Sequence, residues 1–531
     1  MATIEKTIGR VLEEVSQEYS SNNALVHTEL GVRYTHDLLA WEVDRVAAGL
    51  IDSGIKKGDR VAIWANNIPE WITAFLAVAK IGSIVVPIDP DADRDTLHFI
   101  LIQSECKAMV AARGLDIEDY EDMILYERDR VPSLEYIFSV SDKTFPEMIP
   151  WFDLTAIGGG LDKSALRERS DAVQPEDSVA IMYTSGTTGR PKGVVLNHLG
   201  LINKSICSAD RQRLTHNDKL CLFFPLFHMF GNTCIALTGL LRGATLVMPG
   251  QVFEPAKVLK TIYEENCTAI YGSPSMLAGL INHSEFKNKR CKTLVKGTIG
   301  GAPCPKELMR RLVQDVGISG LTVAYGITEA SSWITMTDPD DSIEVKTSTI
   351  GRPLDCNEVK IADPVTSETL QQGRKGELCT RGFLMREYYK MPGATAAAID
   401  RQGWFHTGDL GEIDEMGYVK ISGRVKDLIT REGVEINPIE IEEILHMVPE
   451  VLEAYVFGFP HPKKGQEIAA WIRLKEGTKI SMITICAHIK DRLGVEIMPE
   501  YFKVVDDFPM TRSGKVQKFK LSEMAYKEYL S

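Results

Sequence analysis

One glycine- and hydroxyl-rich segment, residues 184–193, carries the side chains best suited to chemistry in this chain. It reads T-S-G-T-T-G-R-P-K-G, so four hydroxyl side chains, two glycines and one lysine fall within its first nine positions. Glycines let backbone N–H groups turn inward, the hydroxyls add donors, and the lysine adds a compact positive charge. These groups predict a polyphosphate-binding loop formed by Thr184, Ser185, Gly186, Thr187, Thr188, Gly189 and Lys192.

The spacing of this loop differs from that of a Walker A loop, in which the lysine directly follows a glycine and precedes a serine or threonine. Here Gly186, Gly189 and Lys192 are each three positions apart. Taken alone, the segment is also compatible with a Ser/Thr-rich surface turn. The elements around it therefore have to be considered.

The loop follows an apolar run, residues 178–182, that predicts a buried strand. Strand-like and helix-like patterns alternate through most of the chain, beginning with a βαβ unit over residues 61–87. Further predicted strands lie at 220–223, 245–248, 269–271, 295–299 and 321–324, and further helices at 255–265 and 305–316. The fold class is therefore α/β, with layered, mostly parallel sheets covered by helices and ligands bound beyond the carboxyl ends of strands.

The pattern changes after about residue 422. A helix at 439–446, two strands at 452–459 and 468–474, a helix at 483–493 and a polar tail predict a small, mobile α+β domain. The predicted domains are residues 1–425 and 426–531, joined at the segment S-G-R-V-K-D of residues 422–427.

Four further segments contain candidate functional residues, each with an ordinary structural explanation when taken alone. The segment Tyr325–Glu329 combines an aromatic ring, a glycine, a hydroxyl and a carboxylate, which are the groups needed to stack a base and to hold Mg²⁺. Asp409 could accept hydrogen bonds from sugar hydroxyls, His228 lies in an aromatic loop, and Lys515 lies in a glycine-containing tail.

Composition limits the class of protein. The net charge of −13 argues against nucleic acid as the main partner. No apolar run reaches the ~18 residues of a membrane span, and the first residues lack an apolar signal core, so we expect a cytoplasmic protein without an integral membrane segment. The ten cysteines include no C-x-x-C pair, which argues against a zinc site or redox motif.

Taken together, the order and spacing of the motifs resemble those of the adenylate-forming superfamily, which includes acyl- and aryl-CoA synthetases. The resemblance extends from about residue 20 to the end, and its matching segments are Tyr183–Gly193, Pro225–Gly231, Gly300–Pro303, Tyr325–Glu329, Gly408–Asp409, Gly423–Asp427 and Thr511–Lys515. Within the superfamily the chain is most similar to medium-chain fatty acyl-CoA synthetases.

The resemblance implies an ATP-dependent acid–CoA ligase that forms AMP, with ATP, Mg²⁺ and coenzyme A as cofactors or co-substrates. It assigns the β- and γ-phosphates to the loop at 184–192, the α-phosphate to Thr328, and Mg²⁺ to Glu329. Tyr325 and the pair Gly301-Ala302 would flank the adenine, and their neighbours Gly326 and Pro303 are counted with them as cofactor-binding residues.

The remaining implied roles fall mostly in the last part of the chain. Asp409 and Arg424 would bind the ribose, and Lys515 would bridge the carboxylate and the α-phosphate. His228 would line the route between acyl group and thiol. Lys426 would be the hinge about which the small domain rotates, so that the loop containing Arg431 and Gly433 replaces Lys515 at the adenylate.

This chain departs from the family pattern at three places: the loop Arg431–Pro438, the residue Phe405 and the bulky Trp333. Gly326 stands where acetate-specific relatives carry tryptophan, and the surroundings of His228 lack an acidic anchor for an amino group. We therefore expect a short- or medium-chain fatty acid as substrate, with an aryl or alicyclic acid as the second choice, and a monomer or homodimer. The other open alternatives are a ligase that loads a carrier protein, a luciferase-like oxidation and a non-catalytic binding protein.

Overall fold

The computed structural model describes residues 2–112, 117–141, 147–160, 163–184, 191–286, 291–493, 497–510 and 516–529. Six predicted site residues lie outside this described part: Ser185, Gly186, Thr187, Thr188, Gly189 and Lys515. The chain divides into two compact units, one made of Met1–Glu358 and Thr380–Phe405 and the other of Val359–Cys379 and His406–Ser531. This grouping does not test the predicted domain boundary at residues 425–426 or the hinge at Lys426, which stay predictions.

The first unit contains two large sheets. In the described residues, one sheet has nine strands in the order β16 (Arg352–Pro353), β15 (Ser332–Met336), β14 (Gly320–Ile327), β13 (Lys296–Gly300), β12 (Ala269–Gly272), β10 (Lys219–Cys221), β11 (Thr245–Met248), β1 (Asn23–His27) and β2 (Val32–Thr35). The other has eight strands in the order β19 (Glu387–Tyr388), β9 (Lys192–Asn197), β8 (Ser178–Thr184), β4 (Ile84–Ile88), β3 (Arg60–Trp64), β5 (Cys106–Ala112), β6 (Tyr136–Val140) and β7 (Ile149–Pro150). The inner strands of both sheets are parallel and antiparallel pairs occur toward the edges, which confirms the predicted fold class.

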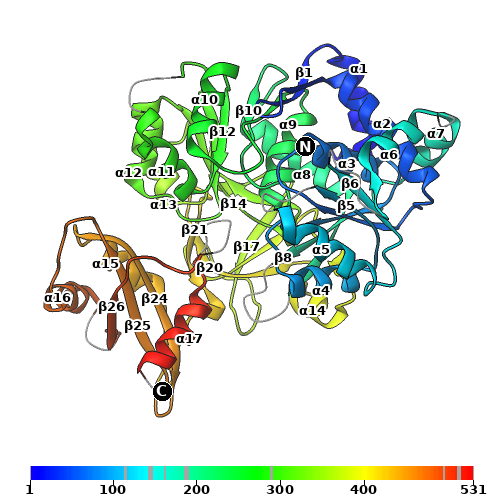
Figure 1. Ribbon diagram of the computed structural model, residues 1–531. Helices are drawn as coiled ribbons and strands as arrows, with labels where there is room; N and C mark the ends of the chain where they lie inside the picture. The colour runs from blue at the N-terminus through cyan, green and yellow to red at the C-terminus, as the bar shows by residue number, and fades with distance from the viewer. Residues whose placement is uncertain are drawn as a thin grey trace. The chain divides into compact units, whose positions relative to one another are not determined.

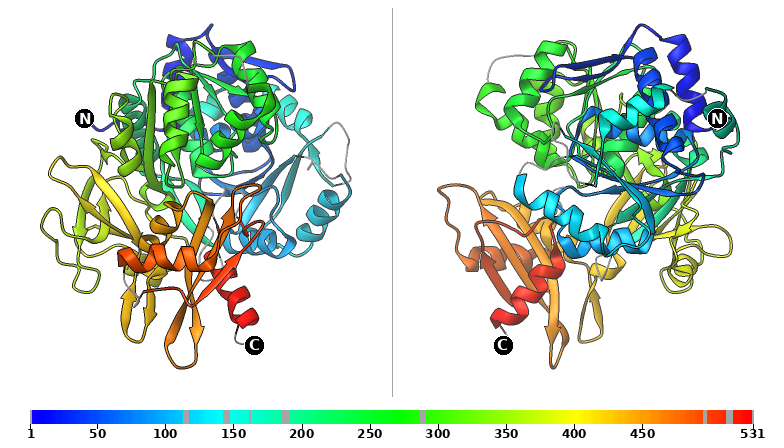
Figure 2. Two further views of the ribbon diagram at one scale, coloured as in Figure 1. Left: turned by 90° about the vertical axis from the view of Figure 1, so that its left-hand side faces the viewer. Right: turned by 45° about the vertical axis from the view of Figure 1, so that its right-hand side comes forward.

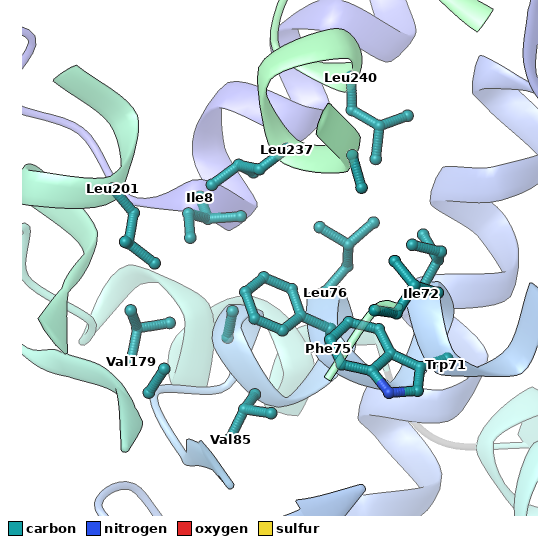
Figure 3. Packing of buried hydrophobic residues seen from close by; sticks show 14 of the residues in the cluster. Ile8, Trp71, Ile72, Phe75, Leu76, Val85, Val179, Leu201, Leu237 and Leu240 are labelled. Atoms are coloured by element: carbon teal, nitrogen blue, oxygen red, sulfur yellow. The ribbon is translucent and has the colours of Figure 1, made fainter. Parts of the chain in front are cut away.

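Helices between the two sheets form the largest core of the first unit (Figure 3). Helix α3 (Pro69–Lys80) has an almost uninterrupted apolar sequence, and nearly all of its residues are buried. A helix that is apolar all round must be covered on every side, and here both sheets contribute: Val85 and Val179 come from the eight-stranded sheet, and Leu220 and Leu246 from the nine-stranded one. Helices α1 (Ile8–Glu18), α2 (His36–Asp52) and α8 (His198–Arg211) complete this layer.

A second core covers the opposite face of the nine-stranded sheet. Its helices are α10 (Pro255–Glu265), α11 (Pro274–Asn282), α12 (Lys306–Arg310) and the π-helix η3 (Arg311–Val316), which gather on one side of the unit (Figures 1 and 2). Alternate residues of one strand enter different cores, since Leu220 belongs to the first and Cys221 to the second. This alternation is the period of two that a buried strand requires.

The second unit contains two smaller sheets. The first has the order β17 (Glu358–Ala362), β18 (Gly376–Arg381), β20 (Phe405–Ile413) and β21 (Val419–Arg424). The second has the order β23 (Val434–Ile436), β22 (Ile429–Arg431), β25 (Gly465–Leu474) and β24 (Val451–His461), and β26 (Tyr501–Val504) also pairs with β25. Helices α15 (Pro438–His446) and α16 (Met482–Leu493) cover one face of the β24–β25 pair, and α17 (Lys518–Tyr529) covers the other (Figure 1).

Two expectations about helices need correction. The predicted polar tail contains α17, whose residues Leu521 and Ala525 are buried against Phe457 and Trp471. Two buried positions four residues apart suffice to dock this helix, too few for a clear apolar stripe in the sequence. The predicted helix at 305–316 changes from α-helical to π-helical at Arg311. Across the described ranges, no helix has the length and apolar character of a membrane span.

Candidate active site

The ends of the predicted phosphate loop lie opposite each other on neighbouring antiparallel strands. Thr184 ends β8, Lys192 begins β9, and the two are backbone partners in the register of this pair. Both side chains are half-buried. The described structure therefore fixes the two ends of this loop, while the roles assigned to its other residues stay predictions.

The second and third predicted segments meet at one edge of the nine-stranded sheet. Strands β13 and β14 are parallel neighbours, and Gly300 is the partner of Ala324 at their carboxyl ends. The exposed turn formed by Gly301, Ala302 and Pro303 leaves β13 there, and Tyr325 lies in the last residues of β14. The structure thus brings together the groups that the sequence assigns to the adenine, at the sheet edge where α/β proteins bind ligands.

Gly326 has a structural reason that the sequence did not reveal. A Cβ atom at this position would lie 2.3 Å from the backbone oxygen of Ser332, because β15 passes directly beside it. The pairing of β14 with β15 also shifts register between Tyr325 and Gly326. The glycine therefore permits the close approach of two strands, and the room that it would leave for an acid longer than acetate stays a prediction.

Glu329, the predicted metal ligand, is held by a segment far away in the sequence. It lies in the short helix η4 (Thr328–Ala330), beside Thr328. The hydroxyl of Tyr388 donates to Glu329 Oε1 at 2.8 Å, and the backbone N–H of Met385 donates to the Glu329 carbonyl at 2.6 Å. The Nζ of Lys192 lies 4.8 Å from the centroid of the Tyr388 ring. Tyr388, which sequence reasoning missed, therefore contacts two of the predicted site residues.

The loop that carries His228 is fixed by an asparagine from another part of the unit. Asn67 donates to the Phe224 carbonyl at 3.0 Å and accepts from the Leu226 N–H at 2.9 Å. His228 Nδ1 accepts from the Phe230 N–H at 3.1 Å. These bonds give the loop a defined conformation at the start of the π-helix η1 (Phe230–Leu237).

Trp333 fills the space next to this loop. Its ring meets that of Phe230 edge-on, with centroids 4.9 Å apart, and it is only 4% exposed. A Cβ atom on Gly300 would lie 2.6 Å from the indole, so the tryptophan covers the end of β13. The contacts place Trp333 between the end of β13 and the His228 loop, and its predicted effect on the length of an acyl tunnel stays a prediction.

The predicted ribose-binding residues are partners on adjacent strands of the second unit. Asp409 on β20 and Arg424 on β21 face each other in the antiparallel register, and Arg424 Nε lies 2.6 Å from Asp409 Oδ1. Asp409 is 2% exposed. The guanidinium of Arg424 gives this buried carboxylate a hydrogen-bonding partner, and a carboxylate oxygen is the kind of strong acceptor that sugar hydroxyls require.

A carboxylate that sequence reasoning missed fixes the turn before Asp409. Glu377 on β18 binds His406 Nδ1 at 2.7 Å through one oxygen and accepts from the Gly408 N–H at 2.9 Å through the other. Thr407 donates to the Leu378 carbonyl at 2.7 Å and accepts from the Asp409 N–H at 3.1 Å. Gly408 has a φ of +72°, which a glycine adopts without strain. The one signal in this region that the sequence analysis used was the segment Gly408–Asp409.

The same residues raise the question of a metal ion. Ligand atoms of Glu377, Cys379 and His406 lie within 4.8 Å of one another. Both oxygens of Glu377, however, already accept N–H groups, one of them from His406. We therefore interpret this group as the support of Asp409.

The other predicted residues of the second unit lie in or near β22. Arg431 donates to Glu467 at 2.9 Å and to the Met498 carbonyl at 3.1 Å, so its guanidinium is bound within the unit. Gly433, with a φ of +83°, forms the two-residue turn between β22 and β23. Lys426 is exposed in the short helix η5 (Val425–Asp427). Their assigned roles stay predictions.

Comparison with known proteins identifies the family. Residues 12–389 match the model of the AMP-binding enzyme family, and residues 440–515 match that of the AMP-binding enzyme C-terminal domain. The chain is 39% identical to the putative acyl-CoA synthetase YngI of Bacillus subtilis, over 98% of this chain and 97% of that protein. It is 33% identical to the mitochondrial medium-chain acyl-CoA ligase ACSF2 of Danio rerio, over 98% of this chain and 89% of that protein.

Solved structures support the same assignment. The crystal structure of ATP-bound MatB from Rhodopseudomonas palustris superposes with a TM-score of 0.86, at 26% identity over 99% of this chain and all of that one. The resemblance stated from the sequence motifs is thus confirmed. The chain belongs to the AMP-binding enzyme family, and its predicted class, an AMP-forming acid–thiol ligase of the acyl-CoA synthetase type, is confirmed with it.

Proposed function

We propose that this ligase activates a short- or medium-chain fatty acid with ATP and transfers the acyl group to coenzyme A. In the first step the acid's carboxylate oxygen attacks the α-phosphorus, forming an acyl adenylate and releasing pyrophosphate. In the second the thiol sulfur attacks the acyl carbon, loses its proton and displaces AMP. The cytoplasm, as expected from the sequence, is the proposed location.

The observation that carries this proposal is the meeting of Lys192, Glu329 and Tyr388 in the first unit. A cation and a carboxylate held by one side chain, at the end of a strand pair that leads into a hydroxyl-rich loop, suit a metal-bound polyphosphate. The names of the relatives, an acyl-CoA synthetase and a medium-chain acyl-CoA ligase, support the choice of acid and thiol.

The described residues fit a magnesium ion. Glu329 Oε1 accepts from Tyr388, whereas its Oε2 has no hydrogen-bond partner among the described residues. An ionised carboxylate oxygen of this kind is the ligand that Mg²⁺ prefers. Bound there with ATP, the ion would neutralise charge that builds up on the phosphates.

The chain's own residues would do the remaining work. Lys192 would offset the repulsion between the acid's carboxylate and the phosphates, and Thr328 would donate to the α-phosphate. Asp409 would accept the ribose hydroxyls, and Lys515 would bridge the reacting groups. Keeping these positions fixed converts the encounter of two anions into a reaction of oriented neighbours.

The acid is argued from the residues around His228. Phe230 and Trp333 present buried aromatic surface, and no carboxylate stands in the segment 222–231 to bind an amino group. Such walls favour an apolar acyl chain. The same aromatic edges would also suit an aryl acid, which is the second candidate.

The test is acid-dependent exchange of pyrophosphate into ATP, measured over straight-chain, branched, alicyclic and aromatic acids. We expect exchange with short- or medium-chain fatty acids, followed by thioester formation when coenzyme A is added. If only aryl acids supported exchange, the substrate would be an aryl acid and the proposed fatty acid would be wrong. Adenylation without transfer to free coenzyme A, but with transfer to a phosphopantetheinylated carrier protein, would overturn the proposed acceptor.

A further inference from the structure

We propose that Tyr388 is a positioning residue that holds the Glu329 carboxylate and the Lys192 ammonium group in a fixed relation, and so determines how strongly Mg²⁺ tightens the binding of ATP. This inference rests on the proposed function. It adds to it a residue that belongs to neither the phosphate loop nor the segment of Glu329, and that contacts both.

The backbone of Tyr388 is anchored to the strand that begins with Lys192. Strand β19 pairs with β9, and Tyr388 is the partner of Val194. The N–H of Tyr389 donates to the Gly193 carbonyl at 2.7 Å, and the N–H of Tyr388 donates to Thr395 Oγ1 at 2.9 Å. Any displacement of Tyr388 would therefore break strand pairing.

The short segment 385–388 holds both the main chain and the side chain of Glu329. The Met385 N–H binds its carbonyl at 2.6 Å, and the Tyr388 hydroxyl binds Oε1 at 2.8 Å. The phenol hydroxyl is the donor of this second bond. One carboxylate oxygen is thus fixed, while Oε2 has no partner among the described residues.

The aromatic ring positions Lys192 without neutralising it. Its face lies 4.8 Å from Nζ, within the range of a cation–π contact. In the described ranges, no carboxylate forms an ion pair with Lys192. A carboxylate partner would cancel the charge that a phosphate needs, whereas an aromatic face orients the ammonium group and leaves its charge available.

A buried tyrosine could instead serve packing alone, since Tyr388 is 5% exposed and belongs to the large core. The two readings differ in what they expect from removal of a single oxygen atom. Packing predicts little change in ligand binding when the ring remains. A positioning role predicts that Mg²⁺ tightens ATP binding less when the oxygen is removed. Loss of a partner that orients a metal-binding group typically lowers metal affinity ~10–100-fold.

The experiment measures ATP binding without any acid, by calorimetry, in excess Mg²⁺ and again in EDTA. Tyr388→Phe keeps the ring under Lys192 and removes the bond to Glu329. We expect the ratio of the two dissociation constants to fall about tenfold, with unchanged binding in EDTA. Tyr388→Leu also removes the ring, so we expect weaker binding in EDTA as well.

Tyr389→Phe is the matched control, because its hydroxyl is removed one residue farther along while its ring lies beside Lys390. Thermal melting of each variant shows whether it is folded, and Tyr388→Met replaces the leucine variant if that one is not. A wild-type ratio in Tyr388→Phe, or an equal loss in Tyr389→Phe, would overturn the inference. Failure of the wild-type protein to bind ATP, or to catalyse acid-dependent exchange, would instead overturn the proposed function.

Discussion

The predicted phosphate-binding residues of the first unit and the ribose-binding residues of the second are supported in different ways. In the first, Glu329 depends on Tyr388, 59 positions away, and Lys192 lies over the same ring. In the second, Asp409 is fixed by its strand neighbour Arg424 and by the turn that Glu377 holds. A carboxylate inside paired strands is fixed by its strand neighbours, whereas a carboxylate in the short helix η4, between β14 and β15, is fixed by a segment far away in the sequence.

This difference corresponds to what each group would do in the proposed reaction. The phosphates change charge during adenylation, so groups that bind them can stabilise the transition state more than the bound substrates. The ribose does not change, so its ligands bind both states equally. Variants of the phosphate-binding residues should therefore lower kcat. Variants of the ribose-binding residues should raise the KM for ATP and leave kcat unchanged.

The largest effect is expected at Lys515, the cation that the family resemblance places at the reacting groups. Lys515→Ala should slow adenylation ~10²–10³-fold, the usual cost of removing a group that stabilises transition-state charge. Thioester formation from supplied acyl adenylate should be spared. The experiment measures the rates of adenylation and of thioester formation separately, and Lys520→Ala, at an exposed position, is the control. Equal losses in both half-reactions would contradict a role of Lys515 in adenylation alone.

How much of this could be predicted from the sequence depends on the distance over which each signal acts. Strand β11 and helix α10 have the predicted bounds, because an apolar run or stripe is local information. The aspartate and arginine of the ribose side were predicted singly from family motifs. Tyr388 had no signal of its own, because its importance arises from the pairing of β19 with β9, which joins segments far apart in the chain.

The next largest effect is expected at Asp409. Asp409→Asn keeps the shape of the side chain but removes the charge, and hydrogen bonds to charged groups are worth about 1.5–3 kcal/mol. The KM for ATP should therefore rise about tenfold to a hundredfold at unchanged kcat. Steady-state kinetics with ATP varied measure both quantities, and a fall in kcat at constant KM would remove the distinction between the two regions.

Glu377 should have a smaller effect, because it acts through Asp409 rather than on the nucleotide. Glu377→Gln keeps an acceptor for the Gly408 N–H but loses the charged contact with His406, and a single hydrogen bond contributes about 1 kcal/mol. We expect the KM for ATP to rise about fivefold at constant kcat. In Asp409→Asn the same change should have less effect, since the two residues act in series. Glu412→Gln, on the same strand as Asp409 and 3.8 Å from Lys420, is the control.

The smallest effect is expected at Arg424. Its side chain is 41% exposed, and exposed ion pairs contribute about 0.2–1 kcal/mol. Arg424→Gln should raise the KM for ATP about two- to fivefold, and added salt should reduce the difference from wild type because it weakens the ion pair that only the wild type contains. Lys420→Gln on the same strand controls for loss of positive charge from β21. A larger loss than in Asp409→Asn would mean that the arginine itself carries the nucleotide contact, and the ribose side would then depend on its exposed cation rather than on its buried carboxylate.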